Sequence, residues 1–459
     1  MQALLVGRFH AVTRGQSAWL ESLGKEPVER LVCVVTSADH AGTRRNPLDA
    51  ATREQMLAPA LKRCGKPFHV VHIKDIPDSS MWVEHVQANV ERTIGQWPTP
   101  MDTVIYSANR DVDALFKAKG FNVVSREVSG LTPHELVRRV AEGKSWEEDA
   151  TPETRAVYGQ PEVQAKLKAI YGQKLVNDDG ELGHQRDFLT YGTQMDASLK
   201  QKLDDLVPLV KPGRIVDKGC GTGKLMVELS RLFPGSGIVG VDLSREFLRM
   251  CDENTYATED VDLVCGNVAD QNVADGSATT VVFSSVTHEI YSYSNYSLAE
   301  LDRAMVNAFK ELAPGGRVLI RDGVSPEPAM WRLELIDPAA RETFERFAKE
   351  FKHGAGATFE RLSPSTVRLS SHDANEFICK KDYLKNWHIE VHEEFGAYTL
   401  KGYAQMLERA GFTAVTASGS VNPWIAQNRY QGKVALFDDA GKALPWPDTN
   451  CVISGTKPG

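Results

Sequence analysis

Cysteine is scarce in this chain of 459 residues, and it follows no pattern that is typical of metal sites or disulfide frameworks. The seven cysteines are scattered along the sequence, and no two of them are spaced as Cys-x-x-Cys. An odd number of dispersed thiols is typical of reduced proteins and argues against a structural zinc site. We therefore expect a cytoplasmic protein with free thiols and no bound metal.

The sequence also lacks a long apolar run, a secretory leader and an excess of positive charge. No stretch approaches the roughly 18–20 apolar residues that span a bilayer, and Met1–Gly7 lacks the basic start of a signal peptide. Lysine and arginine number 53 against 61 acidic residues, which gives a formal charge of −8. Because binding to phosphate backbones requires an excess of Lys and Arg, we expect neither a membrane nor a nucleic acid as partner. A small-molecule substrate fits this composition.

A glycine-rich turn near the middle is the strongest signal that the chain does contain. Residues 215–224 read Ile-Val-Asp-Lys-Gly-Cys-Gly-Thr-Gly-Lys, and apolar residues then recur at helical spacing up to Leu232. This pattern predicts a strand, a tight turn and a helix. Glycines suit such a turn because they reach positive φ at little cost and let a ligand approach the backbone.

Four further apolar runs follow the turn. The first ends in Asp242, whose carboxylate suits a pair of ribose hydroxyls. The second leads into Cys265-Gly266-Asn267-Val268, the third covers 279–284, and the fourth, at 316–320, follows the turn Ala-Pro-Gly-Gly. Strands that alternate with helices in this way predict a doubly wound α/β fold.

This ordered series resembles the class I S-adenosylmethionine-dependent methyltransferases, over roughly Tyr191 to Thr456. The resemblance implies a Rossmann-like domain at 186–459 and S-adenosylmethionine as cofactor. The cofactor-binding residues that it implies are Tyr191, Asp217, Gly219, Gly221, Gly223, Asp242, Leu243, Asn267, Val268 and Ser284. A dinucleotide-binding oxidoreductase is the competing interpretation, but the last glycine of Gly-x-Gly-x-x-Gly is missing.

Two positions depart from the methyltransferase pattern. Lys218 stands in the turn where an apolar or small residue is more usual. Asn267 stands where an acid often contacts the adenine amino group, although an amide oxygen can still accept that hydrogen bond. Tyr191 belongs to a segment that often folds over the donor in this family, and a purely packing role is the alternative.

The methyl acceptor is expected beside the polar and aromatic residues that follow the strand at 279–284. In open α/β sheets, ligands gather at the carboxyl ends of strands. His288 is the best candidate for a base, with Glu289 orienting it or acting as the base itself. The alternative is that His288 caps the strand end. Further candidate substrate contacts are Tyr291, Tyr293, Arg321 and Trp424.

Beyond the fifth strand we expect a helical insertion at about 325–400 that forms a lid over the acceptor. His388 and His392 are four residues apart, which would place both on one helix face and invites a metal interpretation. A third clear ligand is lacking, so a solvated or lid-facing charged stretch is the default. Val434–Phe437 and a strand near Cys451–Ser454 are expected to close the methyltransferase sheet.

The first part of the chain is a second α/β unit, with strands alternating with helices from residue 3 onward. It resembles the nucleotidyltransferase superfamily, and within it the archaeal-type nicotinamide-nucleotide adenylyltransferases, over residues 1–155. Residues 156–185 are expected to form a linker. The matching motifs are Gly7-Arg8-Phe9, Asn46-Pro47, Ile76-Pro77-Asp78, Trp82-Val83, Tyr106-Ser107 and Ser129-Gly130.

The residues of catalysis are where this second resemblance fails. The family signature His-x-Gly-His reads Thr13-Arg14-Gly15-Gln16 here, and Val137 occupies the usual position of a late arginine, with Arg138 adjacent. Phosphoryl-type transfer depends on positioning and positive charge, so these losses should be severe. Three interpretations remain: a domain that binds a nucleotide without catalysis, a repurposed transferase in which His10 and Arg14 stand in, and an inert relic.

The sequence therefore predicts two doubly wound α/β domains, the second with a helical insertion. The function that we expect is methyl transfer to a small molecule, with a first domain that lacks normal catalysis. The fusion suggests either that this acceptor contains a nucleotide or that the first domain binds a nucleotide as an effector. The alternatives are a bifunctional nucleotidyltransferase and methyltransferase, an RNA-modifying methyltransferase, and a regulatory protein that senses the donor.

Overall fold

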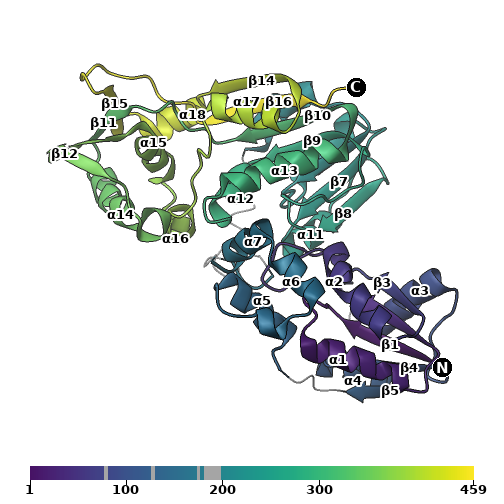
Figure 1. The fold of residues 1–459 in the computed structure, drawn as a ribbon. Helices are drawn as coiled ribbons and strands as arrows, with labels where there is room; N and C mark the ends of the chain where they lie inside the picture. Colours follow the sequence, from purple (N-terminus) through teal and green to yellow (C-terminus); the bar gives the residue numbers. More distant parts are fainter. Residues whose placement is uncertain (77–80, 126–129, 173–175, 180–197) are drawn as a thin grey trace. The chain divides into compact units, whose positions relative to one another are not determined.

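The structure, a computed structural model, divides into two compact units, Met1–Gly180 and Glu181–Gly459. It describes residues 1–76, 81–125, 130–172, 176–179 and 198–459 (Figure 1). Each unit is built around a sheet and cores of its own. The two α/β domains expected from the sequence are thereby confirmed.

A five-stranded parallel sheet in the order β3-β2-β1-β4-β5 forms the first unit. Its strands are β1 (Gln2–Gly7), β2 (Arg30–Val35), β3 (Phe68–His72), β4 (Thr103–Ser107) and β5 (Asn122–Ser125). Leu4 and Leu5 of the central strand are fully buried in two different cores. Successive residues of a strand point to opposite faces, so a strand that is covered on both sides must be apolar throughout.

Helices cover this sheet, and the last two extend the unit beyond the expected boundary at residue 155. The helices are α1 (Arg14–Ser22), α2 (Ala50–Arg63), α3 (Trp82–Ile94), α4 (Arg110–Ala118), α5 (Pro133–Ala141), α6 (Pro152–Tyr158) and α7 (Pro161–Gly172). Tyr158 and Leu167 are fully buried in the core that contains Leu5. The segment that we expected as a linker, 156–185, therefore begins as part of the first unit.

A seven-stranded sheet in the order β14-β16-β10-β9-β6-β7-β8 forms the centre of the second unit. Its strands are β6 (Arg214–Lys218), β7 (Gly237–Asp242), β8 (Val261–Cys265), β9 (Ala278–Ser284), β10 (Leu312–Asp322), β14 (Thr413–Ser420) and β16 (Asn450–Thr456). Strand β16 runs antiparallel to both of its neighbours, and the pairs among the first five strands are parallel. The strand order reverses between β6 and β9, where open α/β sheets bind ligands.

The helices of this part are amphipathic and pack on the seven-stranded sheet (Figure 1). They are α9 (Leu199–Leu206), α10 (Lys224–Leu232), α11 (Arg245–Asp252), α12 (Thr287–Tyr293), α13 (Leu298–Glu311) and α17 (Leu400–Arg409). Met305 of α13 and Met406 of α17 are fully buried in the same core as Val318 of β10.

The expected helical insertion is instead a mixed α/β structure with a sheet of its own. This sheet is antiparallel in the order β12-β13-β11-β15, with β11 (Met330–Leu335), β12 (Phe359–Ser363), β13 (Thr366–Ser370) and β15 (Val434–Asp438). Its helices are α14 (Pro338–Gly354), α15 (Ser371–Lys380) and α16 (Trp387–Glu390). In Figure 1 this sheet stands apart from the seven-stranded one.

Placing Val434–Phe437 among the closing strands of the methyltransferase sheet was therefore wrong. Val434 and Leu436 are buried together with Phe344 and Phe347 in the core of the smaller sheet. The closing strand beside β16 is β14. A period of two residues indicates a half-buried strand, but it carries no information about which sheet the strand joins.

Candidate functional site

The glycine-rich turn after β6 has the backbone that the sequence predicts. Gly219, Gly221 and Gly223 have φ values of 82°, 52° and 76°, the left-handed region that favours glycine. A Cβ atom on Gly219 would lie 2.6 Å from a methyl group of Val286, and one on Gly223 would lie 2.8 Å from the Cys251 sulfur. Side chains are therefore excluded from the turn by both conformation and space.

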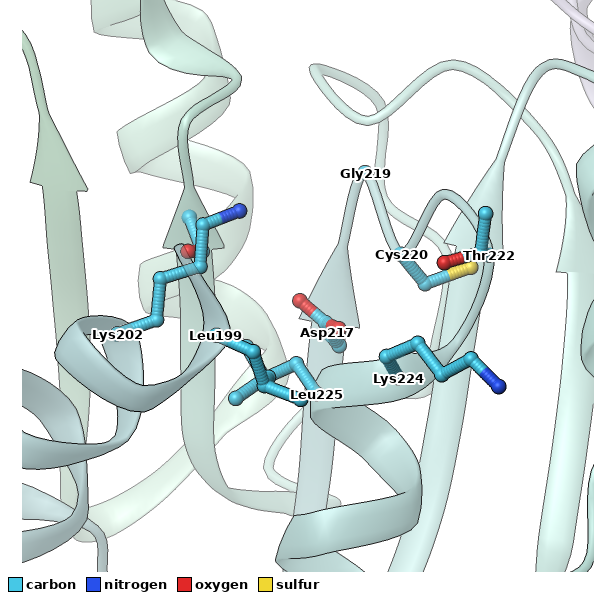
Figure 2. Close-up of a pocket in the computed structure, with 9 residues that line it drawn as sticks. Leu199, Lys202, Asp217, Gly219, Cys220, Thr222, Lys224 and Leu225 are labelled. Carbon is cyan, nitrogen blue, oxygen red and sulfur yellow. The ribbon is translucent and has the colours of Figure 1, made fainter. Parts of the chain in front are cut away.

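A small pocket that is open to solvent lies against this turn. Figure 2 shows side chains around it from β6, the turn that follows β6, α9 and the start of α10. The lining residues are Leu199, Lys202, Asp217, Gly219, Cys220, Thr222, Lys224, Leu225 and Ser284. Asp217 Oδ1 and Ser284 Oγ are both buried, and neither has a hydrogen-bond partner among the described residues. Buried polar atoms are normally satisfied by protein, water or ligand, so two unsatisfied oxygens in one pocket fit a site for a polar ligand.

The charge of Asp217 is poorly compensated in this pocket. Burial raises the pKa of its carboxyl to about 7, with a further rise from the charge of Asp242, while nearby Lys202 opposes the shift. A buried carboxylate of this kind favours the arrival of a cation. The pocket therefore suits a ligand that places a positive charge close to Asp217.

Asp242, at the end of β7, holds the turn and remains available to a ligand. Its Oδ2 accepts a hydrogen bond from Gly221 N and its Oδ1 from Ser244 N, each at 2.9 Å. Burial nevertheless raises its pKa to about 6, and the nearby charge of Glu289 adds to the rise. Each carboxylate oxygen has a second lone pair, so the group can also accept from hydroxyls.

The other predicted cofactor residues lie at the ends of β7 and β8. Leu243 and Asn267 are half-buried and Val268 is buried, and Asn267 Oδ1 accepts a hydrogen bond from Ala269 N at 2.9 Å. Their contact with adenine stays a prediction. Tyr191 lies outside the described residues, as do Pro77, Asp78 and Ser129 of the motifs in the first unit.

His288, at the start of α12, makes its closest contact with an acid at the end of the neighbouring strand β10. Its Nδ1 lies 2.7 Å from Asp322 Oδ1. Asp322, at the end of β10, also accepts hydrogen bonds from Thr287 and Gly323. The orienting carboxylate is thus Asp322, whereas we expected Glu289 in that role.

A second carboxylate faces the other ring nitrogen of His288. Glu393 Oε2 lies 3.8 Å from His288 Nε2, and its side chain is only 2% exposed. The hydroxyl of Tyr293, a predicted substrate contact, donates to Glu393 Oε1. Burial alone would lower the pKa of His288, but the adjacent Asp322 and the charges of Glu393 and Glu289 raise it to about 10. The imidazole is therefore protonated at neutral pH.

The remaining predicted acceptor contacts are placed less favourably. Arg321 is buried, and its Nε donates to Asp205 Oδ2 of α9 at 2.9 Å, so its charge is already neutralised. Trp424 is 60% exposed on the short helix α18 (Pro423–Ile425). Tyr291 is half-buried, and burial together with Glu394 raises its pKa.

Sequence reasoning missed Lys202 and Leu199 of α9 as pocket residues. Leu199 and Leu206 mark the apolar face of this helix, and Lys202 lies between them at helical spacing and is 7% exposed. A lysine on the buried face of a helix is rare unless it is paired or functional. That irregularity was a usable signal.

In the first unit, the side chains at the positions where the family signature is lost make hydrogen bonds that stabilise the fold. Thr13 and Gln16 form a capping box at the start of α1, each accepting from the backbone N–H of the other. Arg53 is fully buried and donates to the backbone oxygens of Arg8, Thr36 and Ser37 at 2.9–3.0 Å.

His10 and Arg14, the two stand-ins considered for catalysis, differ in their surroundings. Burial lowers the pKa of His10 to about 3, and the charges of Arg53 and Arg8 add to this effect. Arg14 is exposed at the start of α1. His10 is therefore neutral at physiological pH and cannot supply positive charge to a phosphate.

Comparison with known sequences identifies both units. A family described as "Methyltransferase domain" matches residues 216–320. Nicotinamide-nucleotide adenylyltransferases resemble the N-terminal region. The relative from Halorubrum lacusprofundi is 31% identical over 159 residues, which cover 34% of this chain and 83% of that protein. The relative from Methanosarcina acetivorans is 32% identical over 153 residues, 32% of this chain and 81% of that protein.

Solved structures of methyltransferases are similar at low identity. The SAM-dependent methyltransferase of Thermotoga maritima is 15% identical, with a TM-score of 0.34, over 60% of this chain and 97% of that chain. The methyltransferase SibL is also 15% identical, with a TM-score of 0.34, over 59% of this chain but only 58% of its own length. At these TM-scores the likeness adds nothing to the sequence match. In the described part of the chain, no helix combines the length and the apolar character needed to cross a bilayer.

Proposed function

The N-terminal third of this chain belongs to the nicotinamide-nucleotide adenylyltransferase family and a methyltransferase domain follows it, and from this we propose a methyltransferase that uses S-adenosylmethionine. Its acceptor would be a small molecule that contains a nucleotide, and the first unit would bind a nucleotide without transferring it. We place the enzyme in the cytoplasm, in line with its dispersed free thiols.

The observation that carries this proposal is the pair of unsatisfied buried oxygens in the glycine-walled pocket. Asp217 Oδ1 and Ser284 Oγ offer hydrogen-bond acceptors where the backbone turn excludes side chains. The cationic methionine part of S-adenosylmethionine would meet the buried carboxylate of Asp217, and Asp242 would hold the ribose hydroxyls. Leu243, Asn267 and Val268 would flank the adenine. The cofactor would supply an activated methyl group on a sulfonium.

The first unit supports binding without transfer. Thr13 and Gln16 satisfy each other at the start of α1, where the family places its two histidines, and His10 is neutral. Transfer of a nucleotidyl group needs positive charge on the transferring phosphate. Thr13, Gln16 and His10 supply none, and of the two stand-ins for catalysis only Arg14 is cationic. The family fold still offers the carboxyl ends of β1 and β4, where the strand order reverses, as a place for a ligand.

Titration calorimetry with S-adenosylmethionine tests the donor site. The wild type should bind, whereas Asp242→Ala should weaken binding by about a hundredfold, because hydrogen bonds to a charged group contribute about 1.5–3 kcal/mol each. Asp252→Asn, an exposed position on α11, serves as the control and should leave binding unchanged. Absence of binding to the wild type, or normal binding to the Asp242 variant, would contradict the assignment.

A further inference from the structure

The surroundings of His288 limit what its two ring nitrogens can do. Asp322 accepts five hydrogen bonds, from the Nδ1 and backbone N of His288, the N and Oγ of Thr287, and the N of Gly323. A carboxylate with so many donors stays ionised, and its pKa is about 2, because the charge of His288 outweighs the effect of burial. His288 Nδ1 therefore carries a proton and is fully committed to Asp322.

On the other side of the ring, Glu393 Oε2 lies 3.8 Å from His288 Nε2. This separation is too long for a direct hydrogen bond. An oxygen atom can, however, lie about 2.8 Å from His288 Nε2 and from Glu393 Oε2 at the same time, since the two atoms are closer than twice that distance. Tyr293 donates to the other oxygen of Glu393, which leaves Oε2 as the one that faces His288.

Charge decides which group can accept a proton. Two buried carboxylates flank one imidazole, and the Glu289 carboxylate lies near as well, so the imidazole is held in its protonated form. A protonated imidazole has no lone pair on Nε2 and can only donate there. Glu393, whose Oε2 faces His288 Nε2, is then the group beside this nitrogen that can act as a general base, whereas we expected His288 or Glu289 in that role.

The cluster adjoins the pocket of the proposed donor. Val286, two residues before His288, lies against Gly219 of the glycine-rich turn, and the charge of Glu289 acts on Asp242. Glu393 comes from the insertion, in a segment that contacts α12: Glu394 N donates to Ser292 Oγ at 2.8 Å, and Tyr296 OH donates to His392 O at 2.6 Å. The insertion thus completes a site that begins on the methyltransferase sheet.

We infer that the group that accepts the methyl is a hydroxyl, of an alcohol or a phenol, and that Glu393 takes its proton while His288 Nε2–H donates to the same oxygen. This inference rests on the proposed methyltransferase function. In the step, the O–H bond breaks and its proton moves to Glu393 Oε2. The oxygen forms a bond to the methyl carbon, and the carbon–sulfur bond breaks with its electron pair left on the sulfur. The products are a methyl ether, a neutral thioether and a protonated Glu393.

Other acceptor classes fit this cluster poorly. An aliphatic amine is an ammonium ion at neutral pH, which has no lone pair for attack, and the protonated His288 on one side of the site would repel it. A carboxylate acceptor would be repelled by Glu393. A hydroxyl oxygen can give its proton to Glu393 and at the same time accept a hydrogen bond from His288 Nε2–H.

Methyl-labelled S-adenosylmethionine, incubated with the full chain and a fractionated metabolite extract, tests the acceptor class. We expect the label in a methyl ether, which resists the mild alkali that cleaves methyl esters. Label in an N-methyl or ester product would overturn the hydroxyl assignment but leave the methyltransferase function intact. Failure to bind the donor, or binding without label transfer to any fraction, would contradict the function as well.

The purified labelled acceptor then allows the base to be identified. Glu393→Gln should lower kcat by about a hundredfold with donor affinity unchanged, and Glu342→Gln, an exposed position on α14, should match the wild type. The unchanged donor affinity shows that the variant is folded.

The pH–rate profile separates the two candidate bases. With Glu393 as base, the wild-type rate on an aliphatic alcohol should be level from neutral pH to about pH 9 and then fall as His288 loses its proton. With His288 as base, the rate should instead rise tenfold per pH unit toward its pKa of about 10. A rising profile, or full activity of Glu393→Gln, would overturn the role of Glu393.

Discussion

At the scale of single residues, burial is the main influence on the pKa values of the two acids in the proposed donor pocket, and it outweighs the effect of their hydrogen-bond partners. Asp217 and Asp242 both have raised pKa values, although Asp242 accepts two backbone hydrogen bonds. Their ionised forms are costly in the absence of a cation. We therefore expect the folded protein to be more stable with a cationic ligand in the pocket than without one.

Asp217 should make the free energy of unfolding depend on pH. Its pKa is about 7 in the folded chain against 3.8 for an unperturbed group, so its contribution is fully present below pH 3.8 and is lost as the pH rises through 7. Asp217→Asn cannot titrate. Relative to the wild type, the free energy of unfolding of this variant should therefore be higher at pH 8 than at pH 5, with the gap widening by about 1.4 kcal/mol for each pH unit up to the folded pKa.

The comparison should be made by urea unfolding of both proteins at the two pH values, without added ligand. Saturating S-adenosylmethionine should remove much of the difference by stabilising the wild type at pH 8. A difference between the variants that does not change with pH would contradict the buried, titrating carboxylate.

At the scale of elements, the unusual lysine of the glycine-rich turn connects β6 to α13. Lys218 Nζ lies 2.9 Å from Glu311 Oε2, and both side chains are 0% exposed. The same ammonium group donates to Asp270 O and Asn272 Oδ1 at 2.9 Å. The departure from the family pattern is thus explained by an internal ion pair and not by contact with the pocket.

Removal of one partner of this pair should be strongly destabilising. Lys218→Met leaves the Glu311 carboxylate buried without its cation, which should cost about 3–5 kcal/mol. Lys218→Met combined with Glu311→Gln should recover part of that loss, because the amide oxygen can still accept from Val273 N. Urea unfolding of the two single variants and the double variant measures the coupling. Additive single effects would contradict a direct pair.

The elements also show which strands the spacing of apolar residues can predict and which it cannot. The parallel strands of both sheets were predicted because apolar runs and glycine turns are local features, whereas β14 was not predicted. The insertion was expected to be helical, and α14 is indeed long, but β11 precedes it and β15 joins from about 100 positions further along the chain. Pairing between segments so distant in sequence leaves no local pattern.

At the scale of the whole molecule, the chain combines two α/β units, and we propose that only the second catalyses a transfer. The first unit belongs to a family of transferases, but its signature positions are used for capping α1 and for tying strand ends together. The protein is therefore expected to catalyse one transfer reaction.

This expectation can be tested by pyrophosphate release. The full chain, incubated with ATP, Mg²⁺ and nicotinamide mononucleotide, should release pyrophosphate at a rate at least about 10⁴ times below that of an active family member, since each lost donor costs about a hundredfold. A family member assayed in parallel provides the positive control. Release at a comparable rate would favour the bifunctional alternative.

The sequence by itself determined the parts that depend on neighbouring residues: the glycine turn, the acid at the end of β7 and the alternation of strands and helices. Positive φ and amphipathic spacing are properties of a few consecutive residues, so they can be read from the sequence. The placing of Asp322 and Glu393 on the two sides of His288 was decided only by the tertiary structure. Asp322 lies 34 positions from His288, and Tyr293 meets Glu393 across 100 positions. The first contact arises because β10 pairs with β9, and the second because the insertion packs against α12. With them the proton balance of the site changes from a basic histidine to a protonated one.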